Sequence, residues 1–424
     1  MDIDKKKILI LGGRPIGSVE LTERCKQRGL YTIVTDYLPL ESSPAKQVAD
    51  EVWNISTNDV NVLAHKCREK GVDGVLTAVH EFNIRRMLDL CEELNFPCYC
   101  NRHTWKYCDN KLEFKKLCFE AGIEVAKKYD FITAVSYLKK STNTVIVKPV
   151  DSSGSRGFSI CKTSQELEKA IDRAKQFSLT GQIVIEDYIP YDAVIIHYTM
   201  HRGKCNFCGI TDKYSVRFPS TGASVMGLQI IPSKGTEYYL GHVDSKARAM
   251  FENAGFTDGP IWIEAFYDGR SRFIFNEMGY RFGGSMTNYP VKYFYQIDQM
   301  DLMIDVAMGE TTKDVIVCPQ NMDKKYCILP IDLHSGVIES ISGLEILKED
   351  SYINAIAQVH YVGDKIEEWG SAQQVFCYAH IIFEDASDLI QKIKDLLSTL
   401  SVLDENGSNM LFTLYDIESI KTLC

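Results

Sequence analysis

The chain has 424 residues, of which 45% are hydrophobic and 25% are charged, close to the average for a soluble globular protein. This composition excludes a disordered chain, a collagen-like repeat and a small disulfide scaffold, and at about 150 residues per domain the length predicts about three domains. The net charge is -10, whereas a nucleic-acid-binding protein usually carries an excess of basic residues. A local cluster of lysines and arginines could still bind a small anion.

The cysteines and the hydropathy predict a reduced, cytoplasmic protein. The fourteen cysteines are scattered along the chain, and the C-x-x-C pair formed by Cys205 and Cys208 lacks a second pair at zinc-finger spacing. The apolar run at 8–11 is too short for a signal sequence, and no stretch approaches the ~18 apolar residues of a membrane span. We therefore expect neither a membrane nor a nucleic acid among the partners.

The first hundred residues alternate between apolar runs and amphipathic stretches. The predicted strands are 8–11, 31–35 and 74–78, and the predicted helices are 18–27, 59–70 and 82–94. Strands that alternate with helices in this way predict a doubly wound parallel sheet.

A glycine-containing turn, 12–17, joins the first predicted strand to the first predicted helix. It resembles a phosphate-binding loop but lacks the lysine of that motif, and it fails the G-x-G-x-x-G spacing of dinucleotide sites. Asp36 lies about 20 residues further on, where a dinucleotide fold would place its ribose-binding acid. NAD binding is one interpretation, and a plain tight turn or an anion site at the helix N-terminus are the others.

The middle of the chain predicts a small α+β unit, preceded by a helix over 110–121. Its predicted strands are 145–149, 158–161 and 184–189, its predicted helix is 164–176, and 151–157 is a polar loop. Two further strands, 261–267 and 272–277, flank a turn. The tail from about 320 mixes short β-runs with a helix over 386–399 and carries no chemical motif.

Cations and a glycine loop occur together in this middle third. Lys111 begins a helix, Lys148 ends a strand, and the loop 151–157 contains Gly154, Arg156 and Gly157. A nucleoside triphosphate needs cations on its phosphates and a backbone that can approach them closely. Each feature alone is unremarkable, but their combination and order predict a nucleotide site.

A pair of acids lies on the two strands that flank the later turn. Glu264 and Glu277 each belong to an apolar strand, where an unpaired charge would be costly. Mg²⁺ is typically bound by one or two carboxylates together with substrate phosphates. A salt bridge to Lys or Arg is the alternative. Arg281, four residues after Glu277, could offset the charge of a phosphoryl group.

These motifs, in this order, resemble an ATP-grasp enzyme of the branch that includes biotin carboxylase, carbamoyl phosphate synthetase and the purine-pathway carboxylate ligases. The resemblance covers about residues 5–310 and is carried by Asp109-Asn-Lys111, Val147-Lys-Pro149 with the loop that follows, Glu186-Asp-Tyr-Ile189, and the Glu264, Glu277 and Arg281 set.

The resemblance implies an α/β and α+β chain with an ATP-grasp fold. We expect an N-terminal doubly wound (pre-ATP-grasp) parallel sheet over 1–107 and a small, mobile α+β lid with its linker helix over 108–190. A larger antiparallel-sheet subdomain with the metal site would cover 191–318, and a C-terminal lobe 319–424.

The resemblance also assigns roles to residues of this chain. Glu264 and Glu277 would bind Mg²⁺, or Mn²⁺ in its place, and the catalytic residue Arg281 would lie beside the transferred phosphate. The residues implied to bind ATP are Lys111, Lys148, Ser153, Gly154, Ser155, Gly157, Glu186, Asp187, Tyr188, Ile189 and Asp192.

Two positions depart from the family's pattern. Gly279 stands where an asparagine usually follows the second metal-binding glutamate, so one metal ligand is missing or is supplied by water or by Asn276. Val194 stands where a glutamate often holds the ribose hydroxyls, which leaves Asp192 as the candidate for that role.

Substrate binding is expected beyond the carboxyl ends of the N-terminal strands and around a basic segment at 212–217. The candidates are Arg14, His80, Glu81, Lys213, Arg217 and Ser285. Ordinary solvated loop charges, or a plain turn at Ser285, are the alternative interpretation.

The function implied by the resemblance is ligation. ATP would convert a small-molecule carboxylate to an acyl phosphate, and an amine or similar nucleophile would then displace phosphate. The alternatives are a regulatory or scaffold protein that binds ATP without turnover, suggested by Gly279, and an NAD-dependent oxidoreductase. A homodimer is the assembly that we include among the expected partners.

Overall fold

The computed structural model describes residues 5–151, 157–310, 314–315 and 317–423. The N-terminal part is a parallel sheet in the order β3-β2-β1-β4, which confirms the predicted class. Its strands are β1 (Lys7–Leu11), β2 (Tyr31–Thr35), β3 (Glu51–Trp53) and β4 (Gly74–Leu76), and its helices are α1 (Ser18–Gln27), α2 (Pro44–Val48), α3 (Val60–Lys70) and α4 (Glu81–Leu94). Residues 8–11 of β1 are fully buried, as expected of a strand covered on both faces.

The predicted small α+β unit is present and forms an antiparallel sheet in the order β5-β8-β6-β7. Its elements are β5 (Lys128–Tyr129), α7 (Phe131–Leu138), β6 (Val145–Pro149), β7 (Ser159–Cys161), α8 (Ser164–Gln176) and β8 (Ile183–Asp187). Thr163 and Glu166 form a capping box that begins α8. The linker helices α5 (Arg102–Asp109) and α6 (Lys111–Glu120) precede the unit, and the Asn110 side chain caps α6.

A large antiparallel sheet follows, with the path β13-β12-β9-β10-β11-β14-β18-β16 and β20 paired to β14. Its strands are β9 (Asp192–His201), β10 (Lys204–Arg217), β11 (Ser224–Ile231), β12 (Gly259–Tyr267), β13 (Phe273–Gly279), β14 (Lys325–Leu333), β16 (Ile353–Gln358), β18 (Val375–Phe383) and β20 (Leu411–Phe412). Because β11 pairs with β14, the sheet continues across the predicted boundary near 318. The domain boundaries stay predictions.

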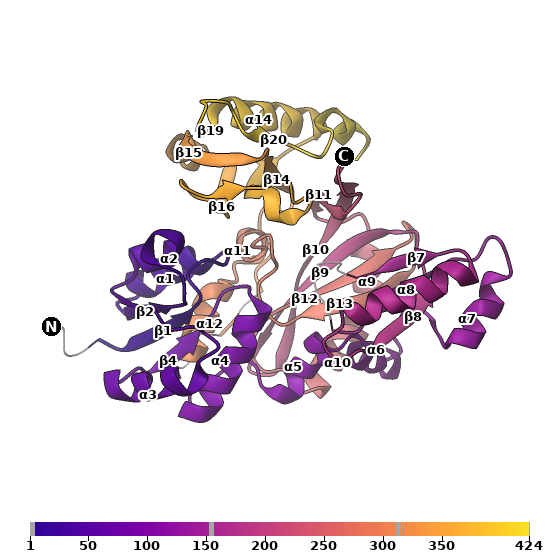
Figure 1. The fold of residues 1–424 in the computed structure, drawn as a ribbon, viewed down its shortest axis with the longest axis horizontal. Helices are drawn as coiled ribbons and strands as arrows, with labels where there is room; N and C mark the ends of the chain where they lie inside the picture. The colour runs from indigo at the N-terminus through magenta and orange to yellow at the C-terminus, as the bar shows by residue number, and fades with distance from the viewer. Residues whose placement is uncertain (1–4, 152–156, 311–313, 316, 424) are drawn as a thin grey trace.

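The remaining helices cover this sheet or join it to the other parts. They are α9 (Thr236–His242), α10 (Asp244–Asn253), α11 (Asn288–Tyr295), α12 (Gln299–Ala307), α13 (Leu344–Glu349) and α14 (Ala386–Thr399). A smaller sheet of β17 (Lys365–Ile366), β15 (Gly336–Ser342) and β19 (Ser401–Asp404) completes the C-terminal lobe. In Figure 1 this lobe, which includes β14 and β16 of the large sheet, lies above the N-terminal sheet on the left and above the strands β9, β12 and β13 near the centre.

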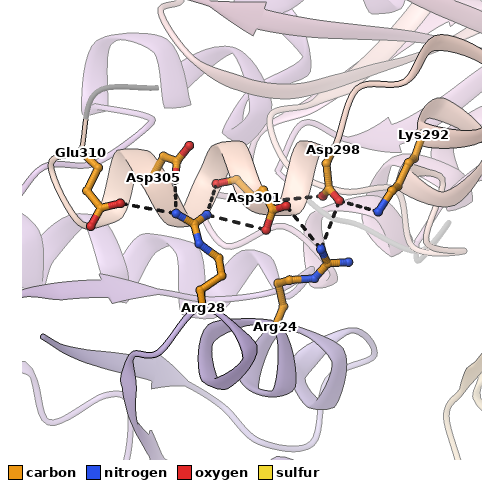
Figure 2. A network of polar contacts seen from close by, with 7 residues as sticks. All are labelled: Arg24, Arg28, Lys292, Asp298, Asp301, Asp305 and Glu310. Atoms are coloured by element: carbon orange, nitrogen blue, oxygen red, sulfur yellow. Dashed lines mark hydrogen bonds and ion pairs between the residues drawn. The ribbon is translucent and has the colours of Figure 1, made fainter. Parts of the chain in front are cut away.

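Ion pairs attach the N-terminal part to the rest of the molecule. Arg24 and Arg28 of α1 face a row of acids on and around α12, and Figure 2 shows the network that they form. Arg28 bonds the Asp305 carboxylate and donates to the Asp301 carbonyl at 3.0 Å, while Arg24 lies 3.4 Å from Asp298. Sequence-distant helices are therefore held together by charge as well as by apolar packing.

Two predictions about composition can be compared with the structure. The cysteines of the described ranges all have free thiols, and most are buried, in agreement with the expected reduced state. Within those ranges, none of the helices combines the length and the apolar character that crossing a bilayer requires.

Candidate functional site

A cavity of about 330 Å³ lies between the small sheet and the large sheet. One wall is formed by β6, β7 and β8, and the other by β9 to β13. The lining residues that the sequence had singled out are Lys111, Lys148, Glu186, Asp187, Tyr188, Ile189, Asp192, Lys213, Arg217, Glu264 and Glu277. Residues separated by more than 150 positions in the chain therefore share one enclosed space.

A buried carboxylate organises the basic side of this cavity. Glu186, on β8, is 1% exposed and pairs with the ammonium groups of Lys148, at 3.0 Å, and Lys115. Burial alone would raise the pKa of Glu186, but the two lysines hold it below its ordinary value. Burial, and then the neighbouring Lys148 ammonium, lower the pKa of Lys115. Lys148 also donates to Asn276 Oδ1 at 2.8 Å and so reaches the opposite wall.

The two predicted metal-binding acids face each other across β12 and β13. Glu264 is directly opposite Glu277 in the strand register. Lys213 Nζ lies 2.7 Å from Glu264, and Lys111 Nζ lies 3.2 Å from Glu277. The Glu264 carboxylate raises the pKa of Lys213. Burial alone would raise the pKa of Glu264, but Lys213 and the Asn276 amide bring it below its ordinary value. Each of the two acids thus has a lysine ammonium group beside it.

This donor set fits a magnesium ion bound together with phosphates. Mg²⁺ usually takes one or two carboxylates and keeps its other positions for water and phosphate oxygens. Glu264 and Glu277 supply two carboxylates, and Asn276, which donates to Glu264 at 3.0 Å, adds an amide at the same place. The described residues contain no cluster of three or more His, Cys, Asp or Glu side chains able to hold a metal by themselves. The phosphates of a nucleotide would therefore complete the coordination.

The other end of the cavity is more apolar. Ile146, Ile160 and Phe266 line it, next to the chain segment 187–189 that follows β8. A flat, uncharged ring system such as a purine suits such a pocket, with polar backbone groups at its edge. Asp192 also lines the cavity, whereas Val194 is buried within β9.

Part of the predicted phosphate-covering loop can be placed. Gly157 is buried and has a positive φ of 76°, and a Cβ at this position would come within 2.6 Å of Phe177. Ser153, Gly154 and Ser155, together with Arg156, lie outside the described residues.

Arg281 lies at a second location, between the N-terminal sheet and the end of β13. It pairs with Glu81 at 2.9 Å and donates to the Phe282 carbonyl at 2.7 Å. Its guanidinium carbon also lies over the Trp262 ring, 5.2 Å from the ring centroid. Glu81 begins α4, which follows β4, so this is the carboxyl edge of the parallel sheet. Burial lowers the pKa of the adjacent His80 and favours its neutral form.

The structure divides the six predicted substrate residues among several places. Lys213 and Arg217 line the cavity described above, and His80 and Glu81 lie beside Arg281. Arg14 instead pairs with Asp364 of the C-terminal lobe at 2.5 Å. Ser285 is buried and donates to Gln229 at 3.3 Å. Arg14 and Ser285 therefore do not join the first cavity.

The Asp36 side chain contacts only neighbouring residues of the N-terminal part among those that the structure describes. Its carboxylate accepts from the Gly13 amide at 2.8 Å and the Ser43 hydroxyl at 2.7 Å, and it pairs with the buried Lys46 at 2.7 Å. These contacts fix the glycine turn and give Asp36 a structural role, which does not favour the NAD interpretation.

For three residues at these two locations, the sequence predicts no function or only a secondary one. Lys115 lies one turn after Lys111 on α6, and that spacing was the available signal. Asn276 precedes Glu277 and bridges Lys148 to Glu264. Trp262 carries no motif, so only the structure shows its contact with Arg281.

Comparison with known proteins identifies the class to which this architecture belongs. Residues 141–289 match the model of the ATP-grasp domain, a range that contains Lys148, Glu264, Glu277 and Arg281. The chain has an ATP-grasp fold, as the arrangement of its parallel and antiparallel sheets indicates.

Curated relatives and solved structures extend this result. The formate-dependent phosphoribosylglycinamide formyltransferase of Prochlorococcus marinus (strain MIT 9301) is 29% identical over 213 residues, which are 48% of this chain and 53% of that protein. The protein of the same name from Bacillus subtilis (strain 168) is 26% identical over 204 residues, 46% and 51% of the two chains. The chain spans about half the length of the curated relatives it matches.

Among solved structures, a biotin carboxylase–β,γ-ATP complex from Campylobacter jejuni has a TM-score of 0.78 at 16% identity, covering 99% of this chain and 94% of that one. An L-amino acid ligase from Bacillus licheniformis has a TM-score of 0.73 at 19% identity, covering 95% and 99%. At these identities the likeness concerns the fold.

Proposed function

We propose that the chain is an ATP- and Mg²⁺-dependent ligase that joins a small-molecule carboxylate to an amine. The observation that carries the proposal is the convergence of Lys111, Lys148 and Lys213 on Glu264 and Glu277 at one end of a single cavity. The names of the similar proteins support it, because they include a formyltransferase, an L-amino acid ligase and a biotin carboxylase.

The lining of the cavity supports one orientation of ATP. The adenine ring occupies the apolar end, between Ile146, Ile160 and Phe266, with the 187–189 backbone at its edge and Asp192 near the ribose. The triphosphate then extends toward Lys148 and Lys111. Lysine ammonium groups in a partly buried site offset phosphate charge more strongly than they would in bulk water.

Glu264 and Glu277 would hold the magnesium ion, with Asn276 beside them. When bound, Mg²⁺ or Mn²⁺ supplies charge neutralisation between the last two phosphates and keeps the terminal one aligned. Lys111 and Lys213 already lie beside the two carboxylates and balance their negative charge.

The reaction would proceed in two steps. A carboxylate oxygen forms a bond to the terminal phosphorus of ATP, the bond from that phosphorus to ADP breaks, and an acyl phosphate results. The amine nitrogen then attacks the acyl carbon, a C–N bond forms, and inorganic phosphate leaves with the C–O electron pair. Arg281 would balance the negative charge on the transferred group. Enclosure between the two sheets would limit hydrolysis of the acyl phosphate.

The acid and the amine would enter from the side of Arg281, Glu81 and His80. Glu81 could accept from an ammonium group of the substrate, and neutral His80 could accept a proton from it.

A phosphate-release assay tests the proposal. Mg·ATP is mixed with formate, bicarbonate or single amino acids, each with a panel of amines, and release of ADP and phosphate is followed. We expect turnover with one pair, and a loss of about 10²-fold or more in kcat for Lys148→Ala and for Glu277→Gln. Lys116→Ala and Glu120→Gln, at exposed positions of α6, are matched controls that should keep wild-type rates.

Tight ATP binding without ADP formation for every pair would contradict the ligase proposal and favour a regulatory or scaffold protein. Full turnover by Lys148→Ala or Glu277→Gln would show that this cavity is not the site.

A further inference from the structure

Trp262 lies across Gly279 on the face of the large sheet that carries the two acids. The Trp262–Gly279 and Glu264–Glu277 pairs are in register on β12 and β13, two residues apart along each strand. Side chains two residues apart on a strand share one face. A Cβ at position 279 would come within 2.3 to 2.5 Å of three indole atoms. The absence of a side chain at Gly279 is therefore what admits the ring.

The ring in turn supports Arg281. The guanidinium carbon lies 5.2 Å from the ring centroid, within the range of a cation–π contact. Glu81 and the Phe282 carbonyl accept from the two terminal nitrogens at 2.9 and 2.7 Å. Nε of Arg281 is buried and has no hydrogen-bond partner in the described part of the chain. The guanidinium is held on several sides, and its Nε–H stays unused.

The Trp262 contact differs in kind from the Glu81 contact. A carboxylate neutralises a guanidinium, whereas an aromatic face attracts and orients it without adding a formal negative charge. The Trp262 contact therefore restricts the rotation of Arg281 without neutralising its charge any further. The restriction matters because a charge that is already in place needs no reorganisation when negative charge develops beside it.

We infer that Trp262 is a positioning residue, which Gly279 admits and which holds Arg281 toward the phosphoryl group in transfer. The inference rests on the proposed function, since it assumes that the terminal phosphate of ATP is transferred beside Glu264 and Glu277. It also gives a physical reason for glycine at position 279: the space beside the second acid is filled by an indole ring.

The test compares the affinity for Mg·ADP alone with the affinity for Mg·ADP plus aluminium fluoride, which mimics a phosphoryl group in transfer. Calorimetric titration needs no knowledge of the acid or amine. In the wild type, aluminium fluoride should tighten ADP binding. The affinity of Trp262→Leu for Mg·ADP alone should stay within about twofold of the wild-type value. The gain in affinity caused by aluminium fluoride should be smaller than in the wild type by about 3- to 30-fold, which is the range of one cation–π contact.

Three further variants sharpen the comparison. Trp262→Phe keeps an aromatic face and should recover most of the tightening. Gly279→Ala should behave like Trp262→Leu, because its Cβ displaces the ring. Trp53→Leu is the matched control, since Trp53 is a buried tryptophan with Lys66 over its ring, in the N-terminal sheet. It should leave the tightening unchanged.

Wild-type tightening in Trp262→Leu would overturn the inference, and so would a Trp262→Phe variant that is no better than Trp262→Leu. Failure of the wild type to bind Mg·ADP would instead contradict the proposed function, and the inference with it.

Discussion

Glu186 shows how a single buried side chain can hold the cations of a site in place. The sequence resemblance places it among the residues implied to bind ATP, and in the structure its buried carboxylate pairs with Lys115 and Lys148. Removing one member of a buried charged group leaves the others uncompensated, which is far more costly than losing an exposed pair. Glu186 therefore explains why two lysines can lie side by side at the phosphate end of the cavity.

Asp332 presents the opposite case, a buried acid without a cation. It lies on β14, is 1% exposed, and its Oδ2 has no hydrogen-bond partner within the described residues. Burial raises its pKa to about 7. Between its unfolded pKa, about 4, and that value, the folded chain holds a proton that the unfolded chain has released, so the free energy of unfolding falls as the pH rises.

Asp332→Asn should remove this pH dependence. We expect the variant to exceed the wild type in free energy of unfolding by about 1–3 kcal/mol at pH 8, with a smaller difference at pH 5, where the folded wild type is already protonated. Urea unfolding at the two pH values measures this. A difference that is equal at both, or larger at pH 5, would contradict the assigned cause.

At the scale of elements, the pairing of β12 with β13 builds the proposed metal site. Its register brings Glu264 opposite Glu277 and Trp262 opposite Gly279. A shift of the register by one residue would turn one acid to the other face of the sheet. The contact of α1 with α12 has a comparable role for the N-terminal part, because it fixes the sheet edge that carries Glu81.

Arg28→Ala should weaken the attachment of α1 to α12. Arg28 is about one quarter exposed and contacts Asp301, Asp305 and Glu310 (Figure 2). We expect the free energy of unfolding to fall by about 1–3 kcal/mol, as for charged hydrogen bonds that are partly shielded from water, and the loss to shrink at high salt.

Arg68→Ala is the control for this prediction. Arg68 pairs with Glu93 on the surface, where both side chains are about half exposed, and exposed pairs contribute about 0–1 kcal/mol. Equal losses for the two variants, or a loss for Arg28→Ala that is independent of salt, would show that the network does not attach the helices.

At the scale of the whole molecule, three parts meet around two polar regions. The cavity proposed to bind ATP lies between the small and the large sheet, while Arg281, Glu81 and His80 lie between the large sheet and the N-terminal sheet. The C-terminal lobe reaches the glycine turn through Arg14 and Asp364. The cytoplasmic location and the homodimer stay predictions.

Local features could be predicted from the sequence because their causes are local. The helices Ser18–Gln27, Ser164–Gln176 and Ala386–Thr399 begin and end where apolar spacing and flanking residues indicate. Lys148, Glu264 and Glu277, which the resemblance groups as ATP-binding and metal-binding residues, line one cavity in the structure. The partners of Arg14 and Arg281, by contrast, are 350 and 200 positions away, and no local pattern indicates such pairs.

The most direct test of the central claim is a crystal structure of the chain with Mg²⁺ and a non-hydrolysable ATP analogue. We predict that the adenine lies between Ile146, Ile160 and Phe266, and that Mg²⁺ is bound by Glu264, Glu277 and phosphate oxygens, with Lys148 on the phosphates. An analogue bound at the 12–17 turn instead, or a triphosphate remote from Glu264 and Glu277, would contradict the account.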